Sequence, residues 1–323
     1  MNARLIRILG WTLLSLCGAA SAYPDRPVTL VAPFAPGGDA DVAARNLQPL
    51  AQRLLGQPVL VVNRAGASGA IGSQSVRQAA PDGLTLLLSR VGSHVVLPAL
   101  NPKAPYRPGD FTAIGLLELN PVACVVRTES PHRTLKDLTD ALRARPGKLN
   151  YSTSGPGTIL NLGPQLMFDA LGLGKDAAVS VAYKGGSDAA MAVMSGEVDF
   201  NCGNLTSLIG NIKGGKLRAL VVTTPERVKD LPEVPTAREA GVPALEAIIG
   251  WSAVVGPPGL PKAVVERWSQ VLQQAARDPA WVAATERAGS IPRVLPPAET
   301  ERYIADQAAV YERLAKTLNL VVE

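Results

Sequence analysis

Short apolar runs alternate with amphipathic segments along most of this chain. The runs are rich in Val, Leu and Ile, as buried strands are, and lie at 28–32, 58–63, 82–89, 111–127, 148–153, 179–183, 198–202, 216–224 and 248–256. Apolar residues at helical spacing predict helices in the segments between them and near the end, among them 41–55, 134–147, 261–288 and 297–318. This alternation of strands and helices predicts an α/β fold.

The same pattern gives several local expectations. Pro49 should kink the first helix, while Thr134 should cap the helix that Gly147 ends. We expect a loop carrying Ser89, Ser93 and His94 after the strand at 82–89. We also expect a proline-rich surface stretch over 97–111 and an irregular connection over 226–245.

The clearest motif is a strand that ends in a glycine turn and leads into a helix. It first occurs over 28–50, where Gly37 and Gly38 let the backbone approach a ligand and a helix opens at Asp39 or Asp41. The design recurs in the second half as Ser154–Thr158, which could bind an anion or be only a tight turn. Ligands of open α/β sheets bind at the carboxyl ends of strands. Two such turns on facing sheets therefore predict an anion-binding cleft that closes about a hinge.

The chain is long enough for two domains behind an export signal. Basic residues, an apolar run and the small residues 20–22 predict a cleaved signal peptide over 1–22, and lipidation at Cys17 is disfavoured because Leu16 precedes it. The strand pair around Pro121 crosses into a second domain, and the run at 248–259 returns from it. We therefore expect domain 1 over 23–122 plus 247–323, and domain 2 over 123–246.

Charge and cysteines narrow the function only slightly. The net charge of +5 is spread over scattered basic residues with few aromatic neighbours, which argues against nucleic-acid binding. A mild positive balance suits an anionic ligand, although a solvated surface is the better explanation. Cys124 and Cys202 remain after the signal; they could pair in an oxidising compartment or stay buried as free thiols. The chain has no CxxC and only two histidines, so we expect no metal site.

The sequence carries no recognisable catalytic motif. The segment 210–217 nearly matches a phosphate loop, but Leu217 occupies the position that needs Ser or Thr. His94 and His132 each lie in a predicted loop, with no nearby context for a triad. Asp39 and Asp41 could be catalytic carboxylates, yet capping of a helix start explains them better. We expect neither an enzyme nor a cofactor, with an exported hydrolase as a remote alternative.

A series of ordered motifs resembles one known family, the tripartite tricarboxylate transporter solute receptors, also called Bug receptors. The motifs include YPDRPVTLVAPFAPGGDADVAAR, GQPVLVVNRAGASGAIGSQSV, ARPGKLNYSTSGPGT, VAYKGGSDA and LPEVPTAREAGVP, and they cover nearly all of the chain after the signal. The resemblance implies a two-domain periplasmic receptor of the Venus-flytrap type, with two strand crossings as its hinge. It implies small carboxylates as ligands, held by backbone groups and waters from two facing turns.

The resemblance also implies which residues of this chain line the cleft. They are Phe34, Ala35, Gly37, Gly38, Asp39 and Asp41 from the first turn, Ser154, Gly155, Gly157 and Thr158 from the second, and Ser93, Asn161, Tyr183 and Lys184 beside them. For Lys184, a merely solvated side chain is the simpler interpretation. Where the family often has Asp-Asn, this chain has Gly203 and Asn204, which disfavours a basic or zwitterionic ligand.

The partners implied by the resemblance are a small organic acid and the membrane subunits of a tripartite transporter, with the receptor itself a monomer. A sensing receptor for a signalling partner uses the same fold and remains an alternative. The identity of the acid stays open.

Overall fold

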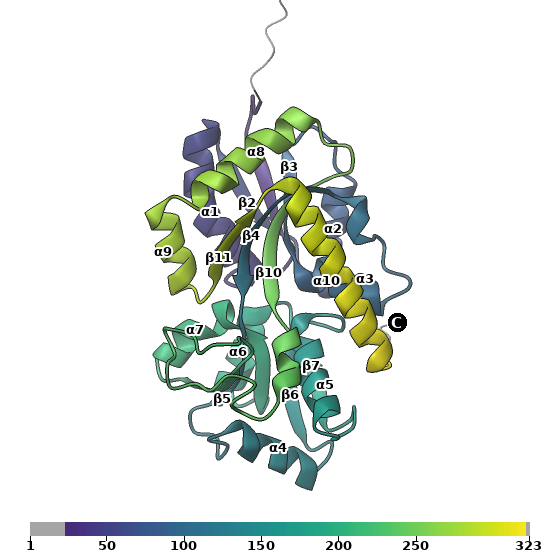
Figure 1. Ribbon diagram of the computed structural model, residues 1–323, viewed down its shortest axis with the longest axis vertical. Helices are drawn as coiled ribbons and strands as arrows, with labels where there is room; N and C mark the ends of the chain where they lie inside the picture. The colour runs from purple at the N-terminus through teal and green to yellow at the C-terminus, as the bar shows by residue number, and fades with distance from the viewer. Residues whose placement is uncertain (1–22, 321–323) are drawn as a thin grey trace, which may run out of the picture.

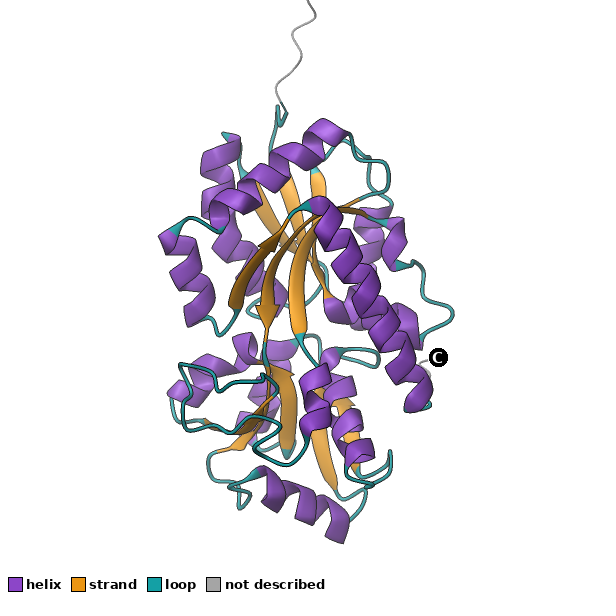
Figure 2. Ribbon diagram, in the orientation of Figure 1, coloured by secondary structure: helices purple, strands orange, loops and turns teal. Residues whose placement is uncertain are grey.

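The computed structural model describes residues 23–320 and has two α/β domains, stacked one above the other in Figures 1 and 2. The upper domain holds a six-stranded sheet in the order β11-β4-β10-β3-β1-β2, and the lower domain a five-stranded sheet in the order β7-β6-β8-β5-β9. The predicted α/β class and two-domain arrangement are confirmed. The predicted signal peptide, with Cys17, lies outside the described residues.

The upper sheet is mixed, with the parallel strands β1 to β3 on one side. Its strands are β1 (Val28–Ala32), β2 (Val59–Asn63), β3 (Thr85–Arg90), β4 (Thr112–Asn120), β10 (Gly250–Gly256) and β11 (Ile291–Leu295). Helices cover both of its faces: α1 (Asp39–Leu55), α2 (Ala70–Arg77), α3 (Leu97–Leu100), α8 (Lys262–Ala275), α9 (Pro279–Arg287) and α10 (Pro297–Thr317). Shorter turns are η1 (Ala67–Gly69), the π-helix η2 (Gly92–Val96) and η3 (Pro108–Asp110).

The lower domain repeats this plan on a smaller scale. Its strands are β5 (Val122–Arg127), β6 (Leu149–Thr153), β7 (Ala178–Ala182), β8 (Phe200–Asn204) and β9 (Leu217–Val222). Its helices are α4 (Leu135–Ala144), α5 (Ile159–Ala170), α6 (Gly186–Ser195), α7 (Leu205–Lys213) and the short η4 (Pro243–Ala247). Thr134 caps α4 as predicted, accepting a bond from the Asp137 backbone.

The domains are joined where β4 passes into β5 through Pro121, as the sequence predicts. The return crossing leads into β10, whose first residue, Gly250, pairs with Asn120 at the end of β4. The two crossings therefore lie side by side, and this pair forms the hinge. No helix within residues 23–320 is both long and apolar enough to cross a membrane.

One helix prediction and one loop prediction need correction. The stretch 261–288 is two helices: α8 ends at Ala275, and Asp278 then caps α9, which has Pro279 in its first turn. A strand, β11, follows it and was not predicted. Ser89 lies inside β3, while Ser93 and His94 lie in the buried π-helix η2 rather than in a loop.

Burial corrects two further predictions. The run at 58–63 was expected to be a buried strand, but β2 is the edge of its sheet, and Leu60 is 49% exposed. The segment 97–111 was expected at the surface, yet Leu97, Tyr106 and Phe111 are buried there. Aromatic packing explains the second case, because the rings of Phe111 and Tyr106 pack edge to face.

Candidate functional site

A small cavity lies between the two domains, at the carboxyl ends of their central strands. Its volume is only about 20 Å³. The first glycine turn contributes Phe34 and Asp39, and the second contributes Ser154 and Thr158. The remaining lining residues are Ala40, Arg90, Val91, Gly92, Ile159, Leu160, Gly186 and Asn204. Both predicted turns therefore reach one cavity.

Three helices have their first residues in the lining of this cavity. Asp39 and Ala40 open α1, Ile159 and Leu160 open α5, and Gly186 opens α6. None of these helices has a side chain bonded to its first N–H groups from its N-cap residue. The first N–H groups of a helix also have no partner within it, and they carry partial positive charge. The cavity wall is therefore rich in hydrogen-bond donors suited to an anion.

The domains touch across the cavity, so the structure is a closed form. Ser68 Oγ donates to the Pro156 carbonyl at 2.7 Å, and Ser187 Oγ donates to the Pro36 carbonyl at 3.2 Å. The backbone N–H of Ala35 donates to the Lys184 carbonyl at 3.4 Å. The first turn thus packs on residues 184–187 and the second on Ser68, rather than each on the other.

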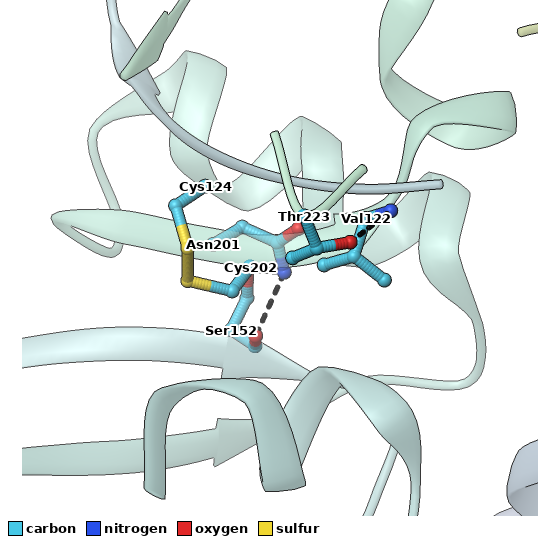
Figure 3. Close-up of a disulfide and its surroundings, with 6 residues drawn as sticks. All are labelled: Val122, Cys124, Ser152, Asn201, Cys202 and Thr223. Atoms are coloured by element: carbon cyan, nitrogen blue, oxygen red, sulfur yellow. Dashed lines mark hydrogen bonds between the residues drawn. A yellow bond between two sulfur atoms is a disulfide. The ribbon is translucent and has the colours of Figure 1, made fainter. Parts of the chain in front are cut away.

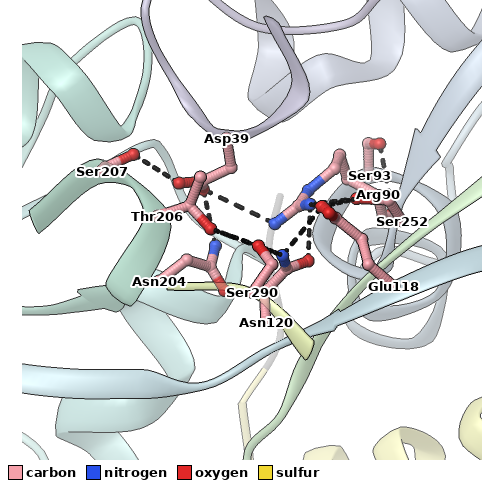
Figure 4. Close-up of polar contacts among 10 residues, drawn as sticks. All are labelled: Asp39, Arg90, Ser93, Glu118, Asn120, Asn204, Thr206, Ser207, Ser252 and Ser290. Atoms are coloured by element: carbon pink, nitrogen blue, oxygen red, sulfur yellow. Dashed lines mark hydrogen bonds and ion pairs between the residues drawn. The ribbon is translucent and has the colours of Figure 1, made fainter. Parts of the chain in front are cut away.

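A buried polar network lies behind the cavity at the hinge (Figure 4). Arg90, at the end of β3, donates through Nη1 to Asn120 Oδ1 at 2.6 Å and to the Ser252 hydroxyl. Glu118 Oε1 accepts from Asn120 Nδ2 at 3.0 Å and from Ser252 Oγ at 2.9 Å. Asn120 also reaches Ser290 at 2.8 Å. The network therefore ties β3, β4 and β10 together where the chain crosses between domains.

Asp39 extends this network into the lower domain. Its Oδ2 accepts from Asn204 Nδ2 at 2.7 Å, and its Oδ1 accepts from the Ser207 hydroxyl. Arg90 Nη2 lies 3.6 Å from the same Oδ2. The predicted capping role is therefore wrong for Asp39, because Gly38 occupies the N-cap position and Asp39 bonds to the other domain instead. Asp41 does stabilise the turn, since it accepts from the Gly37 backbone at 2.9 Å.

Burial shifts the pKa of two groups near the hinge. It raises the pKa of Glu118, with hydrogen bonds and Arg90 opposing the shift. Burial lowers the pKa of His94 to about 3, so this imidazole is neutral at physiological pH. His94 packs against the rings of Phe111 and Trp251, in contrast to the surface position that the sequence suggested. Its place in an aromatic core does not suit a general base.

Several predicted site residues lie outside the cavity lining. Ser93 is fully buried, and its hydroxyl donates to the Arg90 carbonyl at 3.4 Å. The amide of Asn161 donates to the Tyr151 hydroxyl at 3.1 Å, and the Tyr183 hydroxyl is buried. The Lys184 side chain is exposed, in agreement with the simpler interpretation of a solvated lysine. The others outside the lining are Ala35, Gly37, Gly38, Asp41, Gly155, Gly157 and Gly203.

Sequence reasoning missed Arg90 and Glu118. A signal was present, because each is a charged residue within an otherwise apolar strand, in TLLLSR and TAIGLLELN. Charged residues are almost never fully buried unless they are paired. Their positions could therefore have indicated a buried polar cluster, although not its partners.

A disulfide joins Cys124 and Cys202 in the lower domain (Figure 3). The two residues lie directly opposite each other on the antiparallel strands β5 and β8, and both are fully buried. The sequence left a disulfide and two free thiols as alternatives, and the structure has the disulfide. It links the strand that leaves the hinge to the strand that ends at Asn204.

Comparison with known proteins agrees with this architecture. A family model described as "Tripartite tricarboxylate transporter family receptor" matches residues 43–320. A UPF0065 protein of Agrobacterium vitis, from the TAR-I ttuE-ttuC' intergenic region, is 33% identical over 99% of this chain and 92% of its own length.

Two solved structures from Rhodopseudomonas palustris share the fold. MatC with bound malate has 30% identity and a TM-score of 0.85, covering 90% of this chain and 99% of that one. Rpa4515 with adipate has 29% identity and a TM-score of 0.88, covering 93% and 99%. With its two domains, its hinge and a family match over most of its length, the chain belongs to the tripartite tricarboxylate transporter receptor family.

Proposed function

We propose that this protein captures a small carboxylate in the periplasm and delivers it to the membrane subunits of a tripartite tricarboxylate-type transporter. The observation that carries the proposal is the meeting of three helix N-termini, those of α1, α5 and α6, at one interdomain cavity. Charge-assisted bonds from backbone N–H groups hold a carboxylate well. The predicted export signal supports the periplasmic location.

The closed cleft supports capture rather than passive binding. Contacts from Ser68, Ser187 and Asn204 join the domains around the cavity, so an acid bound there would be enclosed by both halves. A ligand that touches both domains stabilises the closed form by its differential affinity. MatC and Rpa4515 share the fold and hold malate and adipate, which are both carboxylates, and this supports a carboxylate as the ligand here.

The proposal assigns the backbone groups of both turns to the ligand carboxylate. Ordered waters can bridge gaps between these donors and different acids. Selectivity then depends on the side chains around the rest of the cleft.

A thermal-shift screen of the protein from Tyr23 onward tests the proposal. The panel contains mono-, di- and tricarboxylates and aromatic acids, each paired with its uncharged amide. We expect a saturable rise in melting temperature for at least one acid and none for its amide. If no acid raises the melting temperature, including after denaturation and refolding to remove any co-purified ligand, the carboxylate proposal is wrong. Uptake of the identified acid by cells with and without the receptor gene tests delivery.

A further inference from the structure

We propose that Asp39 forms a latch with Asn204 and Ser207 that holds the two domains closed without help from a bound acid. The latch regulates access to the cavity of the proposed function. It closes the protein whether or not that cavity binds a carboxylate, so the inference goes beyond the proposed function.

Asp39 belongs to the upper domain but bonds to the lower one. It is the first residue of α1 and is only 8% exposed. Its Oδ2 accepts from Asn204 Nδ2 at 2.7 Å, and its Oδ1 accepts from the Ser207 hydroxyl. Both carboxylate oxygens therefore bind the other domain, as Figure 4 shows.

The two donors are positioned by the start of α7. Asn204 ends β8 and is the N-cap residue of α7, and Ser207 lies in the first turn of that helix. Asn204 turns its side chain to Asp39 rather than to the first N–H groups of the helix. The first turn of a helix also carries partial positive charge. The lower domain therefore offers Asp39 two oriented donors in a favourable field.

Arg90 holds the carboxylate in place from within the upper domain. Its Nη2 forms an ion pair with Asp39 Oδ2 at 3.6 Å, while Nη1 donates to Asn120 Oδ1 at 2.6 Å. Asp39 and Arg90 move together when the domains part, so their ion pair is kept. Only the bonds to Asn204 and Ser207 are then exchanged for bonds to water. The latch can therefore open without leaving a buried charge unpaired.

The other side-chain contacts across the cavity are weaker. Ser68 bonds the Pro156 carbonyl and Ser187 bonds the Pro36 carbonyl, and both of these bonds join neutral groups at exposed positions. Hydrogen bonds to a charged group are about twice as strong as bonds between neutral groups. The buried carboxylate of Asp39 therefore contributes more to closure than either serine.

Small-angle X-ray scattering of the ligand-free protein measures the ratio of closed to open molecules. Any co-purified ligand is first removed by denaturation and refolding with the disulfide kept oxidised. We expect the wild-type curve to match the closed structure. A hydrogen bond to a charged group is worth about one to two factors of ten in an equilibrium constant. Ser207→Ala should therefore lower the ratio about tenfold, and Asp39→Ala, which removes both bonds, about a hundredfold.

Ser75→Ala is the matched control. Ser75 is also a half-buried helix serine, but its hydroxyl donates at 2.7 Å to the Gly72 carbonyl within the upper domain, so the ratio should not change. The double variant Asp39→Ala/Ser207→Ala should be no more open than Asp39→Ala, because Ser207 acts through Asp39. Circular dichroism checks that each variant folds. If Asp39→Ala does not fold, Ser207→Ala keeps every buried charge and decides the test.

Each other outcome is decisive. A wild-type protein that is open without ligand overturns the inference, as does a folded Asp39→Ala or Ser207→Ala variant that stays as closed as wild type. Additive effects of the two substitutions would mean that Asp39 acts apart from Ser207, and they overturn it as well. Because no acid is needed, the latch can fail while the thermal-shift screen still finds a carboxylate ligand, and the screen can fail while the latch holds.

Discussion

Reduction of the Cys124–Cys202 disulfide should destabilise the lower domain. The bridge joins strands separated by 78 residues of sequence. For a loop of that length, the loss of chain entropy in the unfolded state corresponds to about 4.5 kcal/mol at 25 °C. Engineered and native bridges often deliver less than this, so we expect a loss of about 2 to 4.5 kcal/mol.

The tryptophans provide a probe of the other domain. Trp251, Trp268 and Trp281 lie in β10, α8 and α9, all in the upper domain. Urea unfolding is therefore followed by tryptophan fluorescence for that domain and by far-UV circular dichroism for both. With reductant, part of the dichroism signal should be lost at lower urea, while the fluorescence midpoint should move less.

The variant Cys124→Ala/Cys202→Ala is the matched control, because its unfolding should not respond to reductant. A thiol assay on the denatured protein without reductant should find no free thiol at these two positions. Two free thiols, or unfolding curves that coincide with and without reductant, would refute the reasoning.

Three further predictions concern closure, capping and burial. Gly155→Ala should weaken acid binding about fivefold, because the added Cβ would meet Ser68 and break its hydrogen bond to the Pro156 carbonyl, worth about 1 kcal/mol. Gly172→Ala is the control: Gly172 also has a positive φ but lies in open space, so calorimetry should find its affinity unchanged. Thr134→Ala should cost about 1 kcal/mol in urea unfolding through loss of the α4 cap, and a cost near zero would contradict the cap. Burial raises the pKa of Glu118 in the folded protein, so its contribution to stability is fully present below its unfolded pKa and is lost as pH rises through its folded pKa. The free energy of unfolding of Glu118→Gln relative to wild type should therefore increase as pH rises above the ordinary glutamate pKa of 4.5, and a difference independent of pH would contradict this.

Local pattern was sufficient for much of the fold. The apolar runs located β1, β3 and β6, and the Thr134 cap located α4, because the signals lie within a few residues of one another. β11 was missed since its pairing with β4 depends on residues far apart in sequence. Its half-exposed residues do not form a continuous apolar run.

The site was less predictable than the fold. The two glycine turns could be found, because turn chemistry is local. Arg90, Glu118 and Asn120 could not be grouped, since only the crossing of β4 and β10 brings them together. Asp39 was misread for the same reason, because its partners Asn204 and Ser207 belong to the other domain.

The narrowness of the closed cavity has a kinetic consequence. Because the closed cavity has a volume of only about 20 Å³, an organic acid cannot enter while Asp39 and Asn204 remain bonded. Where the closed form dominates, entry must wait for the domains to part. The observed binding rate should then rise with ligand concentration only until it reaches the rate of opening, which becomes a directly measurable property of the hinge.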